Sequence, residues 1–156
     1  MKRLLFASLV FFCGEALAET GRIASLVSFE ATAVRPSTNE DSTTSIINTM
    51  MEYTMPSNIS IYGGFAFSLG DDPESAIGLG ARYYSSSPAF QIIPGAPMWS
   101  YIGVGVDFFD GNVYYPEAGF RIAISDTSRL DIFVRLLNSS NSKYNNHVMV
   151  GAGLTF

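Results

Sequence analysis

Few side chains in this sequence can carry out chemistry, and their types limit the reactions open to it. His147 is the only histidine and Cys13 the only cysteine in 156 residues, so disulfides and His/Cys metal sites lack the residues they need. His147 is the first candidate for acid–base catalysis, because imidazole is the side chain that most readily exchanges protons near neutral pH. If the chain is an enzyme, the candidate catalytic residues are His147, Glu30 and Ser28.

Charged residues in the C-terminal half recur at a spacing that indicates ion pairs. A turn centred on Asp126 would form an antiparallel hairpin with Arg121 opposite Asp131 and Glu117 opposite Arg135. Both contacts join opposite charges, which we interpret as structural ion pairs inside the fold, with a gated path for ions as the alternative. Two further charges fall on the same face of their segments. The predicted internal charge pairs are therefore drawn from Glu117, Arg121, Asp131, Arg135, Arg82 and Asp107.

These residues lie on segments in which apolar and polar side chains alternate, as they do in β-strands. No segment shows a convincing helical period of 3.6 residues. Asp110-Gly111-Asn112 is a strong hairpin signal, whereas Ser86–Met98 is an unusually long connection that contains three prolines. The predicted strands are 22–34, 44–55, 59–69, 76–85, 99–109, 113–125, 129–137 and 144–156.

One face of every predicted strand is apolar and uncharged, and the charges lie on the opposite face. The chain is 47% hydrophobic and 15% charged, yet past the N-terminus no apolar run reaches the roughly 20 residues of a membrane helix. In a transmembrane barrel the apolar face meets lipid and the polar face lines the lumen. The sequence therefore predicts an all-β fold, an eight-stranded antiparallel up-and-down transmembrane β-barrel. The alternative is a soluble periplasmic lipocalin-like barrel that binds an apolar ligand.

The N-terminus has the features of a secretory signal peptide, with Lys2-Arg3, an apolar stretch and the small-x-small site Ala16-Leu17-Ala18. This predicts a signal peptide over 1–18 and one barrel domain over 19–156, exported across the inner membrane. The net charge of −5 and the lack of a basic cluster argue against a nucleic-acid partner. No cofactor or resident metal is predicted, although Asp71-Asp72-Pro73-Glu74 could hold a divalent cation.

The last ten residues, His147–Phe156, place apolar side chains at alternate positions counted back from the terminal phenylalanine. With Leu154 and Phe156, this pattern resembles the C-terminal sorting signal of bacterial outer-membrane proteins, which the barrel-assembly machinery recognises. Together with the signal peptide and the eight strands, it makes the chain resemble the small eight-stranded outer-membrane barrels, such as the OmpA transmembrane domain, OmpX, Ail and the opacity proteins.

This resemblance implies a monomer in the outer membrane of a Gram-negative bacterium, in contact with its lipids and lipopolysaccharide. It further implies a side-chain-filled lumen and a structural or surface-interaction role, of the adhesion or resistance type, rather than an enzyme. A host or surface ligand would meet the external loops, predicted at 35–43, 70–75, 110–112 and 138–143. The alternative function is lipid A modification, because His147, Glu30 and Ser28 resemble the catalytic set of the outer-membrane lipid A deacylases. In that family serine follows the histidine by two residues, where this chain has Met149.

Overall fold

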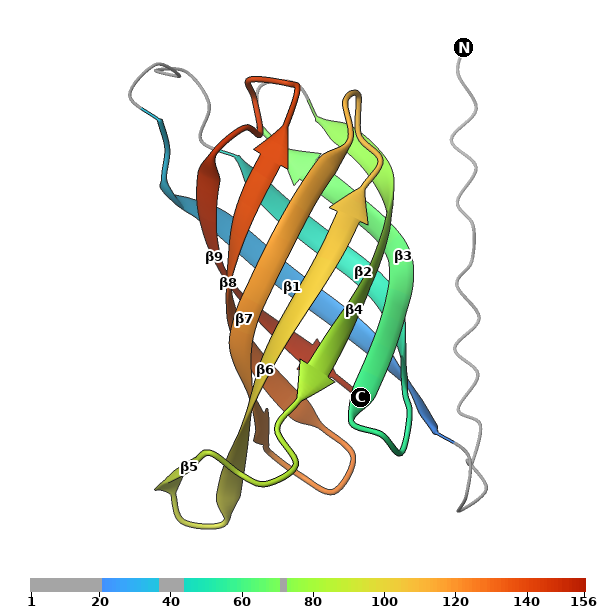
Figure 1. The fold of residues 1–156 in the computed structure, drawn as a ribbon, viewed down its shortest axis with the longest axis vertical. Helices are drawn as coiled ribbons and strands as arrows, with labels where there is room; N and C mark the ends of the chain where they lie inside the picture. Colours follow the sequence, from blue (N-terminus) through green and yellow to red (C-terminus); the bar gives the residue numbers. More distant parts are fainter. Residues whose placement is uncertain (1–20, 37–43, 71–72) are drawn as a thin grey trace.

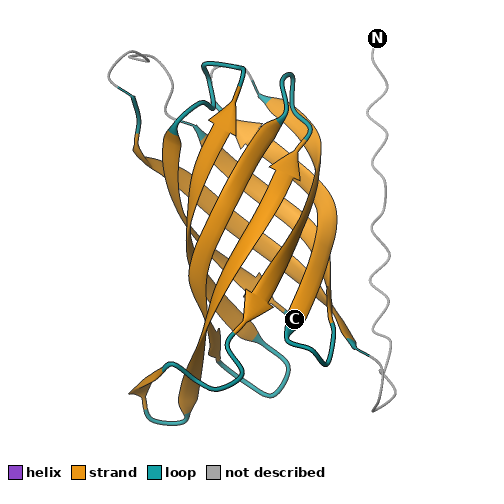
Figure 2. Ribbon diagram, in the orientation of Figure 1, coloured by secondary structure: helices purple, strands orange, loops and turns teal. Residues whose placement is uncertain are grey.

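The computed structural model describes residues 21–36, 44–70 and 73–156, and its secondary structure is entirely β (Figures 1 and 2). Within this part of the chain no helix occurs that is long and apolar enough to cross a membrane. The signal peptide predicted over 1–18 lies outside the described residues, as does most of the predicted loop 35–43. The strands are β1 (Arg22–Val34), β2 (Ser45–Thr54), β3 (Ile59–Leu69), β4 (Glu74–Tyr84), β5 (Phe90–Ile93), β6 (Ala96–Asp107), β7 (Val113–Ala123), β8 (Arg129–Ser139) and β9 (His147–Thr155).

Eight of these strands close into an antiparallel barrel. Consecutive strands pair in a meander, β1 pairs with β9, and β4 pairs with β6, so the ring has no free edge. Closure satisfies the backbone donors and acceptors that an open sheet would leave at its edges. The predicted strand number, antiparallel pairing and closure of the barrel are therefore confirmed.

The fifth strand of the chain, β5, lies outside the ring, and here the sequence-based prediction is wrong. Residues 86–98 were expected to be an unusually long connection without a strand, but Phe90–Ile93 pairs back onto the start of β6, which begins at Ala96 instead of residue 99. The turn passes through Pro94 and Gly95, and Gly95 has a φ of +82° that glycine adopts without strain. A hairpin therefore projects from the end of the barrel at which the C-terminus lies (Figure 1). We call this end the lower end and the opposite end the upper end.

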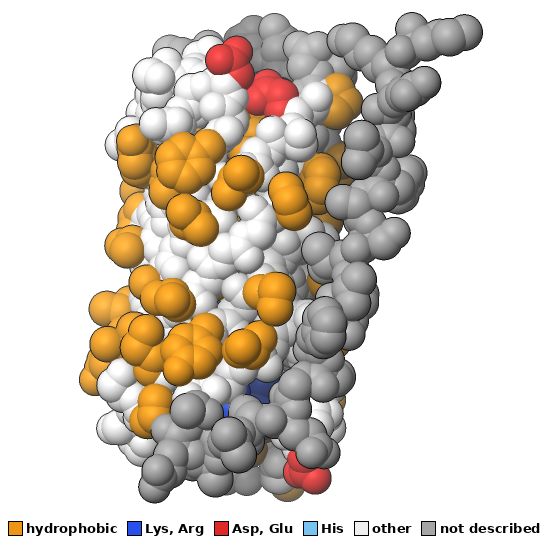
Figure 3. Space-filling view, turned by 90° about the vertical axis from the view of Figure 1, so that its right-hand side faces the viewer, with side chains coloured by type: hydrophobic (Ala, Val, Ile, Leu, Met, Phe, Trp, Pro, Cys, Tyr) orange, Lys and Arg blue, Asp and Glu red, His pale blue; other side chains and the backbone are white. Residues whose placement is uncertain are grey.

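The barrel wall carries its apolar side chains on the outside. Ile102 and Val104 on β6 are 65% and 63% exposed, and Ile132, Val134 and their counterparts on the other strands are also exposed. In the face seen in Figure 3, apolar side chains lie on the wall in an upper and a lower group, and the visible acidic side chains lie at its two ends. The residues between them in sequence point inward and are buried. Among these inward residues are Glu30, Glu52, Arg82, Asp107, Glu117, Asp131 and Arg135.

Inward aromatic rings lie over inward glycines of the neighbouring strand. A Cβ on Gly80 would stand 2.3 Å from Cζ of Tyr62, its partner in the β3–β4 register. The same arrangement recurs around the barrel, so each glycine provides the space for one ring. The four pairs are Tyr62–Gly80, Tyr101–Gly119, Tyr115–Gly105 and Phe133–Gly151.

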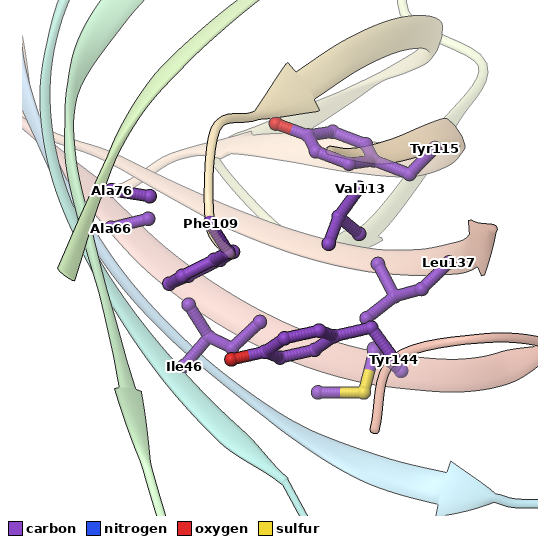
Figure 4. Close-up of a cluster of buried hydrophobic side chains, with 9 residues drawn as sticks. Ile46, Ala66, Ala76, Phe109, Val113, Tyr115, Leu137 and Tyr144 are labelled. Atoms are coloured by element: carbon purple, nitrogen blue, oxygen red, sulfur yellow. The ribbon is translucent and has the colours of Figure 1, made fainter. Parts of the chain in front are cut away.

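Apolar side chains close the upper end of the lumen (Figure 4). Phe109, from the β6–β7 turn, stacks on Tyr144, from the β8–β9 loop, with ring centroids 5.0 Å apart and an interplanar angle of 18°. Buried side chains from the strands, including Ile46, Val113 and Leu137, belong to the same cluster. Burial of this cluster holds the two loops over the mouth of the barrel.

Candidate functional site

A chain of alternating charges runs through the middle of the lumen. Three arginines and four carboxylates are linked by ion pairs between 2.5 and 3.1 Å, and Arg121, 11% exposed, is the most accessible of these side chains. We call this set the lumen network. In order of contact, its members are Glu30, Arg135, Glu117, Arg82, Asp131, Arg121 and Glu52.

Arg82 on β4 holds the centre of the lumen network. Its Nε donates to Oε1 of Glu117 at 2.6 Å, and its Nη1 donates to Oδ2 of Asp131 at 3.1 Å. The guanidinium therefore joins two carboxylates that come from β7 and β8, across the lumen from its own strand. Such charge-assisted hydrogen bonds are stronger than neutral ones, and the guanidinium fork makes them directional.

The two outer arginines extend the chain in opposite directions. Arg135 donates to Glu117 at 2.5 Å and to Glu30 on β1 at 2.6 Å. Arg121 donates to both oxygens of Asp131 at 2.7 Å and reaches Glu52 on β2 at 2.6 Å. The ends of the lumen network are thus two carboxylates on adjacent N-terminal strands.

Each arginine of the lumen network also lies against aromatic rings. The Cζ atom of Arg82 is 4.8 Å from the ring centroids of both Tyr62 and Tyr101. Arg135 lies in the same way between Tyr115 and Phe133, at 4.4 and 4.7 Å, and Arg121 lies 4.7 Å from Tyr84. Cation–π contact strengthens in a desolvated site, so the rings both stabilise the arginines and fill the space around them.

The structure brings the two predicted hairpin pairs together. Arg121 lies opposite Asp131 and Glu117 opposite Arg135 in the β7–β8 register, and both pairs form ion pairs. Arg82, also predicted as an internal charge, joins them. Glu52 was not predicted as a site residue, and Glu30 was considered only as a catalytic residue.

Asp107 departs from the expected charge pairing. It is buried, but neither carboxylate oxygen accepts a hydrogen bond and no ion pair reaches it within the described residues. Its register partners are Gly78 and Val113, which offer no donor side chain. The prediction that Asp107 belongs to a charge pair is therefore wrong.

The candidate catalytic set His147, Glu30 and Ser28 is only partly assembled. Asn48 donates to both Glu30, at 2.9 Å, and Ser28, at 3.3 Å. His147 lies elsewhere, because Glu30 is opposite Gly151, four residues further along β9, a separation of about 13 Å at the usual rise of a strand. The Nδ1 atom of His147 contacts the backbone oxygen of Asn145 at 3.1 Å instead. The expected proximity of His147 and Glu30 is not observed.

At the upper end, Glu74 makes contacts that bear on the suggested cation site. Its carboxylate accepts hydrogen bonds from Lys143, at 2.9 Å, and from the hydroxyl of Tyr144, at 3.2 Å. Partial burial opposes the charge of Lys143, but its hydrogen bonds to and electrostatic interactions with Glu74 and Tyr144 together outweigh this effect and raise the pKa of the amine. Asp71 and Asp72, the other members of the suggested site, lie outside the described residues.

The C-terminal residues of the suggested sorting signal complete the last strand. Leu154 points outward and is 48% exposed, and Phe156 is 51% exposed. Phe156 exchanges two backbone hydrogen bonds with Ser25, of 2.8 and 2.9 Å. The chain end is therefore bound to β1 at the seam where the barrel closes.

Arg121 and Asp131 provide a direct test of the network energy. We expect Arg121→Asp and Asp131→Arg each to lower the free energy of unfolding, because each places like charges together in a buried site. The double variant restores opposite charges across β7 and β8, and should recover about 0.5–3 kcal/mol relative to the sum of the single changes. Urea unfolding of all four proteins in detergent micelles measures this coupling. Simple additivity would show that the pair does not interact.

These features define the class of protein, a closed eight-stranded antiparallel β-barrel with a buried salt-bridge network in its lumen. Neither the family models nor the curated protein sequences contain a match to the chain.

Proposed function

We propose that the chain is an outer-membrane β-barrel that spans the bilayer as a monomer and serves a structural or surface-interaction role. The observation that supports this most is the inversion of the barrel, with apolar side chains outside and charges inside. In water, each Å² of exposed apolar surface costs about 25 cal/mol, and a wall covered with such side chains would favour aggregation. In lipid the same wall meets an apolar solvent.

The dimensions and ends of the barrel agree with this setting. Its strands have 9 to 13 residues, against the ~9–11 that a tilted strand needs to cross the hydrocarbon. The predicted signal peptide and the C-terminal pattern ending at Phe156 support export and recognition by the barrel-assembly machinery. Under this proposal the surroundings are outer-membrane lipid and lipopolysaccharide, and a surface ligand would meet the upper loops.

The filled lumen supports a role that needs no transport through the barrel. The lumen network and its aromatic rings occupy the middle of the barrel, and the Phe109–Tyr144 stack lies over its upper end. A lipocalin-like protein would instead need an apolar interior to hold its ligand. We also assign no reaction to the chain, because the separation of His147 from Glu30 along the β1–β9 register gives no support to a lipid A deacylase.

Electrophoresis with and without boiling tests the proposed membrane setting. A folded outer-membrane barrel resists dodecyl sulfate because every backbone donor of its strands is paired in the closed ring. We therefore expect the unboiled protein from the membrane fraction to migrate differently from the boiled protein. Carbonate extraction of the same membranes provides the control, since a peripheral or soluble protein is released. A protein that is extracted by carbonate and shows no shift on boiling would contradict the proposal.

A further inference from the structure

The β5–β6 hairpin has the composition of a buried segment although it projects from the barrel. No Asp, Glu, Lys, Arg or His occurs between Tyr83 and Val106, a stretch that includes the whole hairpin. The β7–β8 turn at the same end, residues 124–128, contains Asp126 and Thr127. Turns in contact with water usually contain polar residues, as the 124–128 turn does. The uncharged hairpin therefore indicates surroundings other than water.

The outward face of the hairpin continues the outward face of the barrel wall. Phe90 on β5 lies opposite Met98 on β6, and Met98 lies opposite Ile122 on β7. Residues opposite one another in antiparallel strands point to the same side of the sheet. The same row continues into the closed ring without a polar interruption. Its successive members are Phe90, Met98, Ile122, Leu130, Leu154 and Val27.

A ring contact holds the hairpin against the outside of the barrel. The rings of Phe90 and Phe120 meet edge to face, with centroids 5.7 Å apart and an interplanar angle of 62°. Phe120 belongs to the outward series of β7, which includes Pro116 and Ala118. Phe90 nevertheless remains 57% exposed. The contact therefore directs Phe90 toward the surroundings of the wall and away from the lumen.

We propose that the β5–β6 hairpin is a membrane-interface anchor, whose face with Phe90 and Met98 lies at the boundary between acyl chains and headgroups at the lower end. This inference rests on the proposed membrane setting of the barrel, and it extends the lipid contact to a segment outside the ring. Aromatic side chains favour this boundary.

Single-cysteine labelling tests this placement directly. The only natural cysteine is Cys13, so a Cys13→Ser background leaves each introduced thiol unique. We choose Phe90→Cys on the hairpin, Val104→Cys on the middle of the wall and Thr127→Cys on the neighbouring turn. Each protein carries an NBD fluorophore and is reconstituted into phosphatidylcholine–phosphatidylglycerol vesicles, with or without bromine on the acyl chains. The boiling shift of each variant verifies that its barrel has folded.

The three labels separate this inference from the proposal on which it rests. We expect brominated lipid to quench the labels at positions 104 and 90 and to leave the label at position 127 unchanged. Quenching at 104 without quenching at 90 overturns the hairpin anchor and leaves the membrane barrel in place. A label at 90 that is shielded from aqueous iodide but not quenched by bromine also overturns it, because a protein surface would then cover the hairpin. Failure to quench at 104 overturns the membrane setting itself.

Discussion

Replacing Arg82 by leucine is expected to lower the free energy of unfolding by about 3–5 kcal/mol, the usual cost of removing one partner from a buried ion pair. The side chain of Arg82 is fully buried and joins Glu117 to Asp131. Without it, two carboxylates are left with one arginine each, in a site that water reaches poorly. Arg82→Lys should lose less than Arg82→Leu, because the ammonium keeps the charge but lacks the fork that contacts both carboxylates.

Urea unfolding in detergent micelles, followed by the fluorescence of the single tryptophan, Trp99, measures this loss. Arg22→Leu is the matched control, since Arg22 is exposed at the start of β1 and surface changes of this kind usually stay within about 0.5 kcal/mol. Equal losses for Arg82→Leu and Arg22→Leu would mean that the lumen network contributes nothing specific to stability.

Gly80→Ala is the second change for which we expect a large effect, a loss of about 1–3 kcal/mol through overpacking. The new Cβ would stand 2.3 Å from both Cζ and the hydroxyl oxygen of Tyr62. The ring cannot move away freely, because its other neighbour is the guanidinium of Arg82, 4.8 Å from the ring centroid. The substitution therefore disturbs the centre of the lumen network through a residue that carries no charge.

Gly63→Ala is the matched control for this change. Its new Cβ meets only the distal Cδ2 of Leu79 within 3 Å, and Leu79 is an exposed, flexible side chain on the outside of the wall. We expect Gly63→Ala to cost less than Gly80→Ala in the same unfolding experiment. Adding Tyr62→Leu should recover part of the loss caused by Gly80→Ala, because it removes the clashing ring. If the two glycine variants lost equal stability, the close ring–glycine packing would not be the cause.

What the sequence predicted well was local. Alternation along each strand correctly assigns the outward side of Val104 and the inward side of Arg135, because a strand has a period of two. The pairing of Arg121 with Asp131 was also predictable, because a short turn at Asp126 sets the register of its two strands. Inward glycines opposite inward aromatics, such as Gly80 and Tyr62, would have been found by applying the same register to every hairpin.

The features that the sequence did not predict depend on contacts across the barrel. The link from Arg82 to Glu117 and Asp131 depends on the stagger of strands that are not neighbours, and no turn length determines it. The β1–β9 pairing joins the two ends of the chain and contains a register shift between Thr32 and Val34. The position of His147 relative to Glu30 could therefore not be predicted from the sequence. Asp107 resembled the other inward charges in sequence, but its register partners Gly78 and Val113 have no donor side chain.

The order in which the lumen network's members occur along the chain has a consequence for assembly. Its two terminal carboxylates belong to the first hairpin, whereas their arginine partners lie 105 residues later for Glu30 and 69 residues later for Glu52. A partly formed sheet therefore carries unmatched charges on the surface that is to become its interior. Contacts over such distances in sequence form late. These ion pairs therefore stabilise the barrel only once the ring is complete, which makes closure a cooperative step. The charged residues that stabilise the finished barrel as salt bridges are thus unpaired, and destabilising, in an assembly intermediate whose seam is still open.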